Sequence, residues 1–124
     1  MKKKRILVVD DEVGFTRLLS LNLAYQYFVR VENSAEQALQ SALEFKPDLI
    51  VLDVMMPKLD GGELASRIRA TPDLKHVPIV FLTAAAAKGE VHSHGGQIGG
   101  FPFLAKPVSV QDLRACIEEH MPKE

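Results

Sequence analysis

Short apolar runs alternate with helical patterns along the whole chain, and this alternation limits the possible folds more than any other feature. Five segments rich in aliphatic or β-branched residues are predicted strands, namely residues 6–9, 28–32, 49–52, 79–82 and 103–105. Between them, apolar residues recur at the spacing of one helical face. Strands joined through helices predict an α/β fold with right-handed crossovers. We expect a doubly wound, five-stranded parallel sheet of order 2-1-3-4-5 with helices on both faces.

Length and charge narrow the choice of function. The chain has 124 residues, which fits one domain covering residues 1–124. It carries 16 acidic and 15 basic side chains, so its charge gives no reason to expect a direct nucleic-acid or membrane partner. Its single cysteine, Cys116, excludes an intramolecular disulfide. The apolar run after the basic start is too short for a secretory signal, so we expect a cytoplasmic protein.

Polar side chains follow the predicted strands at the points where those strands end. Asp10 and Asp11 follow the first strand, Asp53 the third, Thr83 the fourth and Lys106 the fifth. In a sheet of order 2-1-3-4-5, the first, third, fourth and fifth strands are neighbours. Open α/β sheets bind ligands outside the carboxyl ends of their strands. The sequence therefore predicts that these five side chains converge on one crevice.

This set of side chains suits phosphoryl transfer to a carboxylate. Three carboxylates in one crevice repel one another, and a hard divalent cation such as Mg²⁺ relieves that conflict through oxygen ligands. Lys106 offers a positive charge for Asp53 or for a phosphate oxygen, and Thr83 offers a hydroxyl donor. An aspartate can act as a nucleophile and form an acyl phosphate. Taken singly, each residue has a plainer explanation, such as a helix cap or a surface lysine, and only their joint placement favours a site.

The same residues lie in motifs that resemble those of response-regulator receiver domains in two-component signalling, such as the chemotaxis regulators. Residues 8–12 (Val-Val-Asp-Asp-Glu) resemble the opening acidic motif of that family, and residues 53–61 resemble its phosphoacceptor strand and the loop after it. Residues 82–84 resemble the segment with the switch hydroxyl, and residues 105–107 the Lys-Pro motif. The resemblance spans nearly the whole chain, and it implies the flavodoxin-like fold and a phosphoacceptor signalling domain rather than an enzyme.

The resemblance also implies a role for each acidic residue. Asp53 would take a phosphoryl group from the phosphohistidine of a histidine kinase. Asp11 would bind Mg²⁺ directly, and Asp10 would hold the site partly through water. The backbone carbonyl of Met55 would be a further metal ligand.

Three more roles follow from the resemblance. Thr83 would hydrogen-bond the phosphoryl oxygens, and Lys106 would pair with them. Phe103, three residues before this lysine, lies at the aromatic switch position. The Lys106–Pro107 peptide bond would be cis, which is accessible only before proline at moderate cost.

One segment departs from the family pattern, and several alternatives remain open. Residues 92–103 replace the usual short Gly-Ala turn and tyrosine, so the structure of residues 86–101 is not predicted. The main rival function is a receiver-like module that binds proteins without being phosphorylated. A haloacid dehalogenase-type phosphatase would need an acid where Met55 stands, and a flavodoxin-like electron carrier would need a phosphate loop where the acidic motif stands.

The expected partners are proteins. The phosphoryl donor would be a sensor histidine kinase or a phosphotransfer protein. The signal would pass to a downstream protein target or to an output domain outside this sequence. The sequence alone leaves open whether the chain is a single-domain regulator or part of a longer protein.

Overall fold

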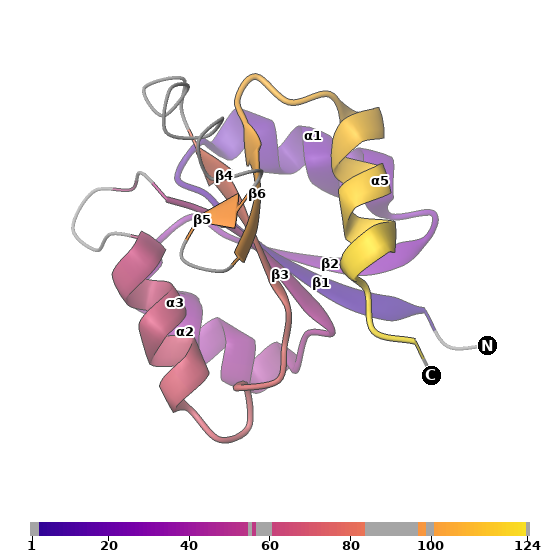
Figure 1. Ribbon diagram of the computed structural model, residues 1–124. Helices are drawn as coiled ribbons and strands as arrows, with labels where there is room; N and C mark the ends of the chain where they lie inside the picture. The colour runs from indigo at the N-terminus through magenta and orange to yellow at the C-terminus, as the bar shows by residue number, and fades with distance from the viewer. Residues whose placement is uncertain (1–2, 55, 57–60, 84–96, 99–100, 124) are drawn as a thin grey trace.

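The computed structural model describes residues 3–54, 56, 61–83, 97–98 and 101–123. Five parallel strands form the sheet, in the spatial order β2-β1-β3-β4-β6 (Figure 1). Their bounds are β1 (Lys4–Val9), β2 (Tyr27–Glu32), β3 (Leu49–Asp53), β4 (Ile79–Thr83) and β6 (Phe101–Ala105). This is the predicted order 2-1-3-4-5, with β6 as the predicted fifth strand.

A two-residue strand, β5 (Gln97–Ile98), extends the sheet beyond β6. It is antiparallel to β6, with Gln97 opposite Pro102 and Ile98 opposite Phe101. The sequence did not predict this strand, because a two-residue segment among glycines has no detectable period. β6 also begins at Phe101, two residues earlier than the predicted strand.

Four described helices cover the two faces of the sheet. They are α1 (Val13–Leu23), α2 (Ala35–Phe45), α3 (Gly61–Ala70) and α5 (Val110–His120). Helices α1 and α5 lie on one face, and α2 and α3 lie on the other (Figure 1). None of the helices in the described ranges is long and apolar enough to cross a membrane.

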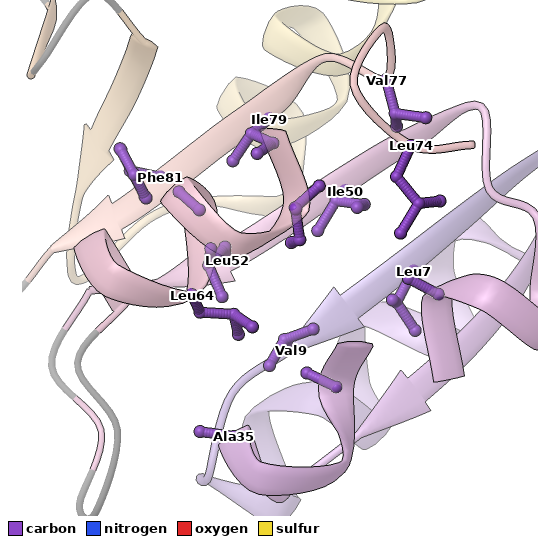
Figure 2. Packing of buried hydrophobic residues seen from close by; sticks show 14 of the residues in the cluster. Leu7, Val9, Ala35, Ile50, Leu52, Leu64, Leu74, Val77, Ile79 and Phe81 are labelled. Atoms are coloured by element: carbon purple, nitrogen blue, oxygen red, sulfur yellow. The ribbon is translucent and has the colours of Figure 1, made fainter. Parts of the chain in front are cut away.

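The two faces of the sheet bury separate apolar clusters, which explains why the central strands are apolar throughout. Leu7 and Val9 of β1 pack with Ile50 and Leu52 of β3 against α2 and α3 (Figure 2). The alternate residues of the same strands face α1 and α5; they include Ile6, Val8, Leu49 and Val51. Each aliphatic side chain buried in this way stabilises the fold by about 1.5–3 kcal/mol. The buried strands therefore hold the residues at their carboxyl ends in fixed positions.

Candidate functional site

Four strand ends bring the predicted polar residues to one edge of the sheet. Asp53 and Thr83 are the last residues of β3 and β4, while Asp10 and Lys106 directly follow β1 and β6. The sheet hydrogen bonds continue past these ends: Val54 N donates to Leu82 O at 2.8 Å, and Lys106 N donates to Thr83 O at 2.7 Å. The backbone at the site is therefore fixed by the same ladder that builds the core.

The three aspartates form a compact acidic cluster. Each offers one carboxylate oxygen, and these atoms all lie within 4.8 Å of one another. Asp10 is 0% exposed and Asp53 is 3% exposed, whereas Asp11 is open to solvent. Buried carboxylates this close repel one another unless a positive charge lies among them.

Lys106 supplies such a charge. Its Nζ lies 2.7 Å from Asp10 Oδ2, 2.6 Å from Glu12 Oε1 and 3.5 Å from Asp53 Oδ2. Partial burial by itself would lower the pKa of Lys106, but Asp10 and Glu12, together with Asp53, raise it above its ordinary value. The lysine is therefore fully charged at neutral pH.

Two neighbours of Lys106 received no role in the sequence analysis. Glu12 was noted only as part of the acidic motif, yet its carboxylate is the shortest ion-pair partner of the lysine. Phe15 lies in α1, and its ring centroid lies 4.9 Å from the Lys106 Nζ. Such a ring attracts the ammonium group and helps to orient it. Contacts between residues more than ninety positions apart leave no periodic signal in a sequence.

The loop that carries the acidic residues is held by one hydrogen bond within the loop and by one from the turn after β2. Glu12 N donates to Asp10 Oδ1 at 2.9 Å, which turns the chain into α1. Asn33, in the turn between β2 and α2, donates through Nδ2 to the backbone oxygen of Asp10 at 2.7 Å. The sequence analysis did not single out Asn33, although its place at the carboxyl end of a predicted strand was a usable signal.

The acidic cluster has the chemistry of a site for a hard cation. The other oxygen of the Asp10 carboxylate, Oδ2, is buried and has no hydrogen-bond partner among the described residues. Its 2.7 Å contact with Lys106 is an ion pair without the alignment of a hydrogen bond. Mg²⁺ prefers oxygen ligands and is usually bound through one or two carboxylates. Asp10, Asp11 and Asp53 therefore fit this ion, with Asp11 open to solvent and the other two buried.

The structure describes all of the remaining predicted site residues except Met55. Thr83 and Phe103 are both buried, 4% and 8% exposed, on the neighbouring strands β4 and β6. The Lys106–Pro107 peptide bond is cis. Met55, the expected backbone ligand, lies outside the described residues, so its predicted role stays a prediction.

The chain matches the response regulator receiver domain family over residues 6–118. It belongs to this family. Its pocket of Asp10, Asp11 and Asp53 is the acidic arrangement typical of the phosphoacceptor site of receiver domains. Membership also confirms the resemblance inferred from residues 8–12 and 53–61.

Two curated relatives show how far the similarity reaches. The chain is 41% identical over 118 residues to the alkaline phosphatase synthesis transcriptional regulatory protein PhoP of Bacillus subtilis, covering 93% of this chain and 47% of that protein. It is 38% identical over 105 residues to the response regulator PleD of Caulobacter vibrioides, covering 84% of this chain and 23% of that protein. The chain thus spans less than half the length of these relatives.

Solved receiver structures match the whole fold. The chemotaxis response regulator CheY4 of Vibrio cholerae superposes with a TM-score of 0.83 at 26% identity, covering 97% of this chain and 100% of that one. A putative response regulator from Chloroflexus aurantiacus gives a TM-score of 0.79 at 34% identity, covering 95% of this chain and 97% of that one. The five-stranded parallel core and its helices are therefore those of the family.

Proposed function

We propose that Asp53 is the phosphoacceptor of this receiver domain and that a sensor histidine kinase or a phosphotransfer protein is its donor. One observation carries the proposal: the buried Asp53 carboxylate ends the central strand β3, within 4.8 Å of the carboxylate oxygens of Asp10 and Asp11. Asp10 and Asp53 are both buried, but Asp10 Oδ2 already contacts Lys106 at 2.7 Å. Asp53 lies farther from the lysine, at 3.5 Å.

In the proposed reaction, an Asp53 carboxylate oxygen attacks the phosphorus of a donor phosphohistidine. A new oxygen–phosphorus bond forms as the nitrogen–phosphorus bond breaks, and the imidazole leaves. Lys106 faces Asp53 and offsets negative charge on the transferring group, and the Thr83 hydroxyl donates to a phosphoryl oxygen. When bound, Mg²⁺ at Asp10, Asp11 and Asp53 supplies further compensation for that charge. The backbone carbonyl of Met55 would be an additional ligand.

Phosphorylation would then switch the domain between two conformations. A phosphoryl group adds about two negative charges and strong acceptor oxygens at Asp53. Thr83 would move toward these oxygens, and Phe103 would fill the space that Thr83 leaves. The change biases populations that exist before phosphorylation. The output would be a downstream protein target or an output domain beyond residue 124.

The domain would act as a signal carrier rather than as an enzyme, although its residues assist their own phosphorylation and dephosphorylation. We place it in the cytoplasm, because a single half-buried cysteine suits a reducing compartment. Neither nucleic acid nor membrane is proposed as a direct partner, since the net charge is −1.

Intact-mass spectrometry after incubation with acetyl phosphate and Mg²⁺ tests the acceptor. We expect the wild type to gain the mass of one phosphoryl group and Asp53→Asn to gain none. Asp73→Asn is the matched control, because Asp73 is exposed and lies outside the acidic cluster. Equal labelling of Asp53→Asn would refute the assignment. A wild type that neither acetyl phosphate nor a histidine kinase labels would favour the unphosphorylated binding module instead.

A further inference from the structure

A single amide group links the two ends of the acidic loop. Asn33 Nδ2 donates to the backbone oxygen of Asp10 at 2.7 Å and to Thr16 Oγ1 at 3.0 Å. Thr16 is 1% exposed, and its hydroxyl donates to Val13 O at 3.0 Å in the first turn of α1. Asn33 therefore joins the residue after β1 to the beginning of α1, and the acidic residues 11–12 lie between these two points.

The turn that carries Asn33 is itself anchored. Asp10 N donates to Glu32 O at 3.1 Å, which ties the end of β2 to the residue after β1. The Glu32 carboxylate accepts from Ser41 Oγ at 2.6 Å and from Ser34 N at 3.2 Å. These bonds hold the β2–α2 turn against α2, so the backbone of Asn33 is fixed in position.

The acidic loop needs these hydrogen bonds, because its negative charges oppose the position in which it lies close to Asp53. The carboxylate oxygens of Asp10, Asp11 and Asp53 lie within 4.8 Å of one another. The single charge of Lys106 offsets only part of their negative charge, and the remaining repulsion favours moving the loop away from β3. A metal site must hold its ligands in place before the ion arrives, and groups that hydrogen-bond the ligating residues serve this purpose. Among the described residues, the Asn33 side chain donates to Asp10 at one end of the loop and to Thr16 of α1 beyond its other end.

We propose that Asn33 is a positioning residue for the metal site: it holds Asp10 against the start of α1 and so keeps the acidic cluster ready for a divalent cation. The proposal rests on the proposed function, because it assumes that the cluster binds Mg²⁺. Asn33 donates to the backbone oxygen of Asp10 and to the Thr16 hydroxyl rather than to the carboxylates of the cluster. Its effect therefore belongs to metal affinity and only through that to the rate of phosphorylation.

Calorimetric titration with Mg²⁺ measures this effect without relying on phosphorylation. Asn33→Leu keeps the approximate size of the side chain and removes both donors, and Asn33→Ala removes the side chain. We expect each variant to bind Mg²⁺ about 10-fold more weakly than the wild type, the lower end of the loss seen when an outer partner of a metal ligand is removed. Thermal unfolding without metal is recorded for each variant in parallel.

Asn22→Ala is the matched control. Asn22 also donates through Nδ2 to a backbone oxygen, that of Leu18 at 2.8 Å, but on the exposed side of α1. This control removes a comparable bond and should leave the Mg²⁺ affinity unchanged. If Asn33 only stabilised the fold, its variants would lower the melting temperature and, like Asn22→Ala, leave the Mg²⁺ affinity unchanged.

Thr16→Val provides a second, independent test. It removes one acceptor of Asn33, so it should weaken Mg²⁺ binding less than Asn33→Leu does, and it should add little in the Asn33→Leu background. If the Asn33 variants do not fold, the affinity of Thr16→Val alone decides. Unchanged Mg²⁺ affinity in all folded variants would overturn the inference while the wild type still binds Mg²⁺ and is phosphorylated. A wild type that binds no Mg²⁺ would refute the metal role in the proposed function as well.

Discussion

The ammonium group of Lys106 lies 2.7 Å from the carboxylate of Asp10, which has no exposed surface. The same nitrogen lies 3.5 Å from Asp53. In the unphosphorylated domain, the lysine is thus held mainly by Asp10 and Glu12 and only secondarily by the proposed acceptor. A phosphoryl group on Asp53 would extend toward the lysine and compete with these two carboxylates for it.

Replacing Lys106 should destabilise the metal-free domain. Lys106→Met would leave the buried carboxylates of Asp10 and Asp53 without their nearest positive charge. Removing one partner of a fully buried ion pair costs about 3–5 kcal/mol. The lysine side chain is 17% exposed, so we expect a smaller loss of about 2 kcal/mol in the free energy of unfolding, measured by urea titration in a chelator.

Lys75→Met is the control for this measurement. Lys75 is exposed and lies outside the site, and a surface substitution of this kind changes stability by no more than about 0.5 kcal/mol. If Lys106→Met is as stable as Lys75→Met, the positive charge of Lys106 is not needed to keep the carboxylates of the acidic cluster together in the folded domain.

Mg²⁺ should stabilise the domain by relieving the repulsion among the three aspartates. A ligand that binds only the folded state at ten times its dissociation constant adds about 1.4 kcal/mol to the free energy of unfolding. We expect the melting temperature to rise with Mg²⁺ and to return to its starting value when a chelator is added. Asp11→Asn should reduce this rise, whereas Asp73→Asn should leave it intact. An identical rise in both variants would contradict a role for Asp11 in binding the ion.

The strand-end residues of the site could be predicted because the topology itself places them. Asp53 ends a fully apolar run, and Thr83 and Lys106 end the two runs that follow it. Once the strands are parallel and ordered 2-1-3-4-5, their carboxyl ends meet at one edge. Hydrophobic period and strand order were therefore sufficient to bring these side chains together with Asp10.

The supporting contacts could not be predicted in this way, because they depend on side-chain positions in three dimensions. Glu12 reaches Lys106 across 94 positions of sequence, and Asn33 reaches Thr16 across 17. Strand β5 exists because it pairs with β6, and its two residues have no pattern of their own. Local periodicity carries no information about such partners.

Thr83 should couple the phosphoryl group to Phe103. Both side chains are buried on neighbouring strands, and Phe103 lies opposite Phe81 in the sheet register. Beryllofluoride, which mimics the phosphoryl group on an aspartate, should shift the aromatic NMR signals of Phe103 in the wild type. Thr83→Ala should remove most of this shift, while Thr83→Ser, which keeps the hydroxyl, should retain it. A full shift in Thr83→Ala would mean that the phenylalanine responds by another route.

Two helical glycines differ in the space around them: Gly61 is packed against backbone, and Gly14 is open. Gly61 is the first residue of α3, and its N–H donates to Val54 O at 3.0 Å. A Cβ atom on Gly61 would lie 2.5 Å from the backbone oxygen of Asp53 and 2.7 Å from the Cα of Val54. Both contacts are with backbone, so no side chain can turn away to make room. The start of α3 therefore has to lie directly against the backbone of the proposed acceptor.

Gly61→Ala should therefore destabilise the domain by about 1–3 kcal/mol, the usual cost of forcing an extra methyl group into a packed site. It should also slow phosphorylation, because relieving the clash moves either α3 or the Asp53 backbone.

Gly14 is the matched control: it lies in α1, and a Cβ atom there would have no neighbour within 4 Å. Gly14→Ala should stabilise the domain by about 0.5–1 kcal/mol through the higher helix propensity of alanine. Urea titration of both variants measures the difference in sign, and phosphorylation by acetyl phosphate should fall only in Gly61→Ala. Equal stability of the two variants would show that α3 can move away from Asp53 at no cost, and that its close approach does not fix the acceptor strand.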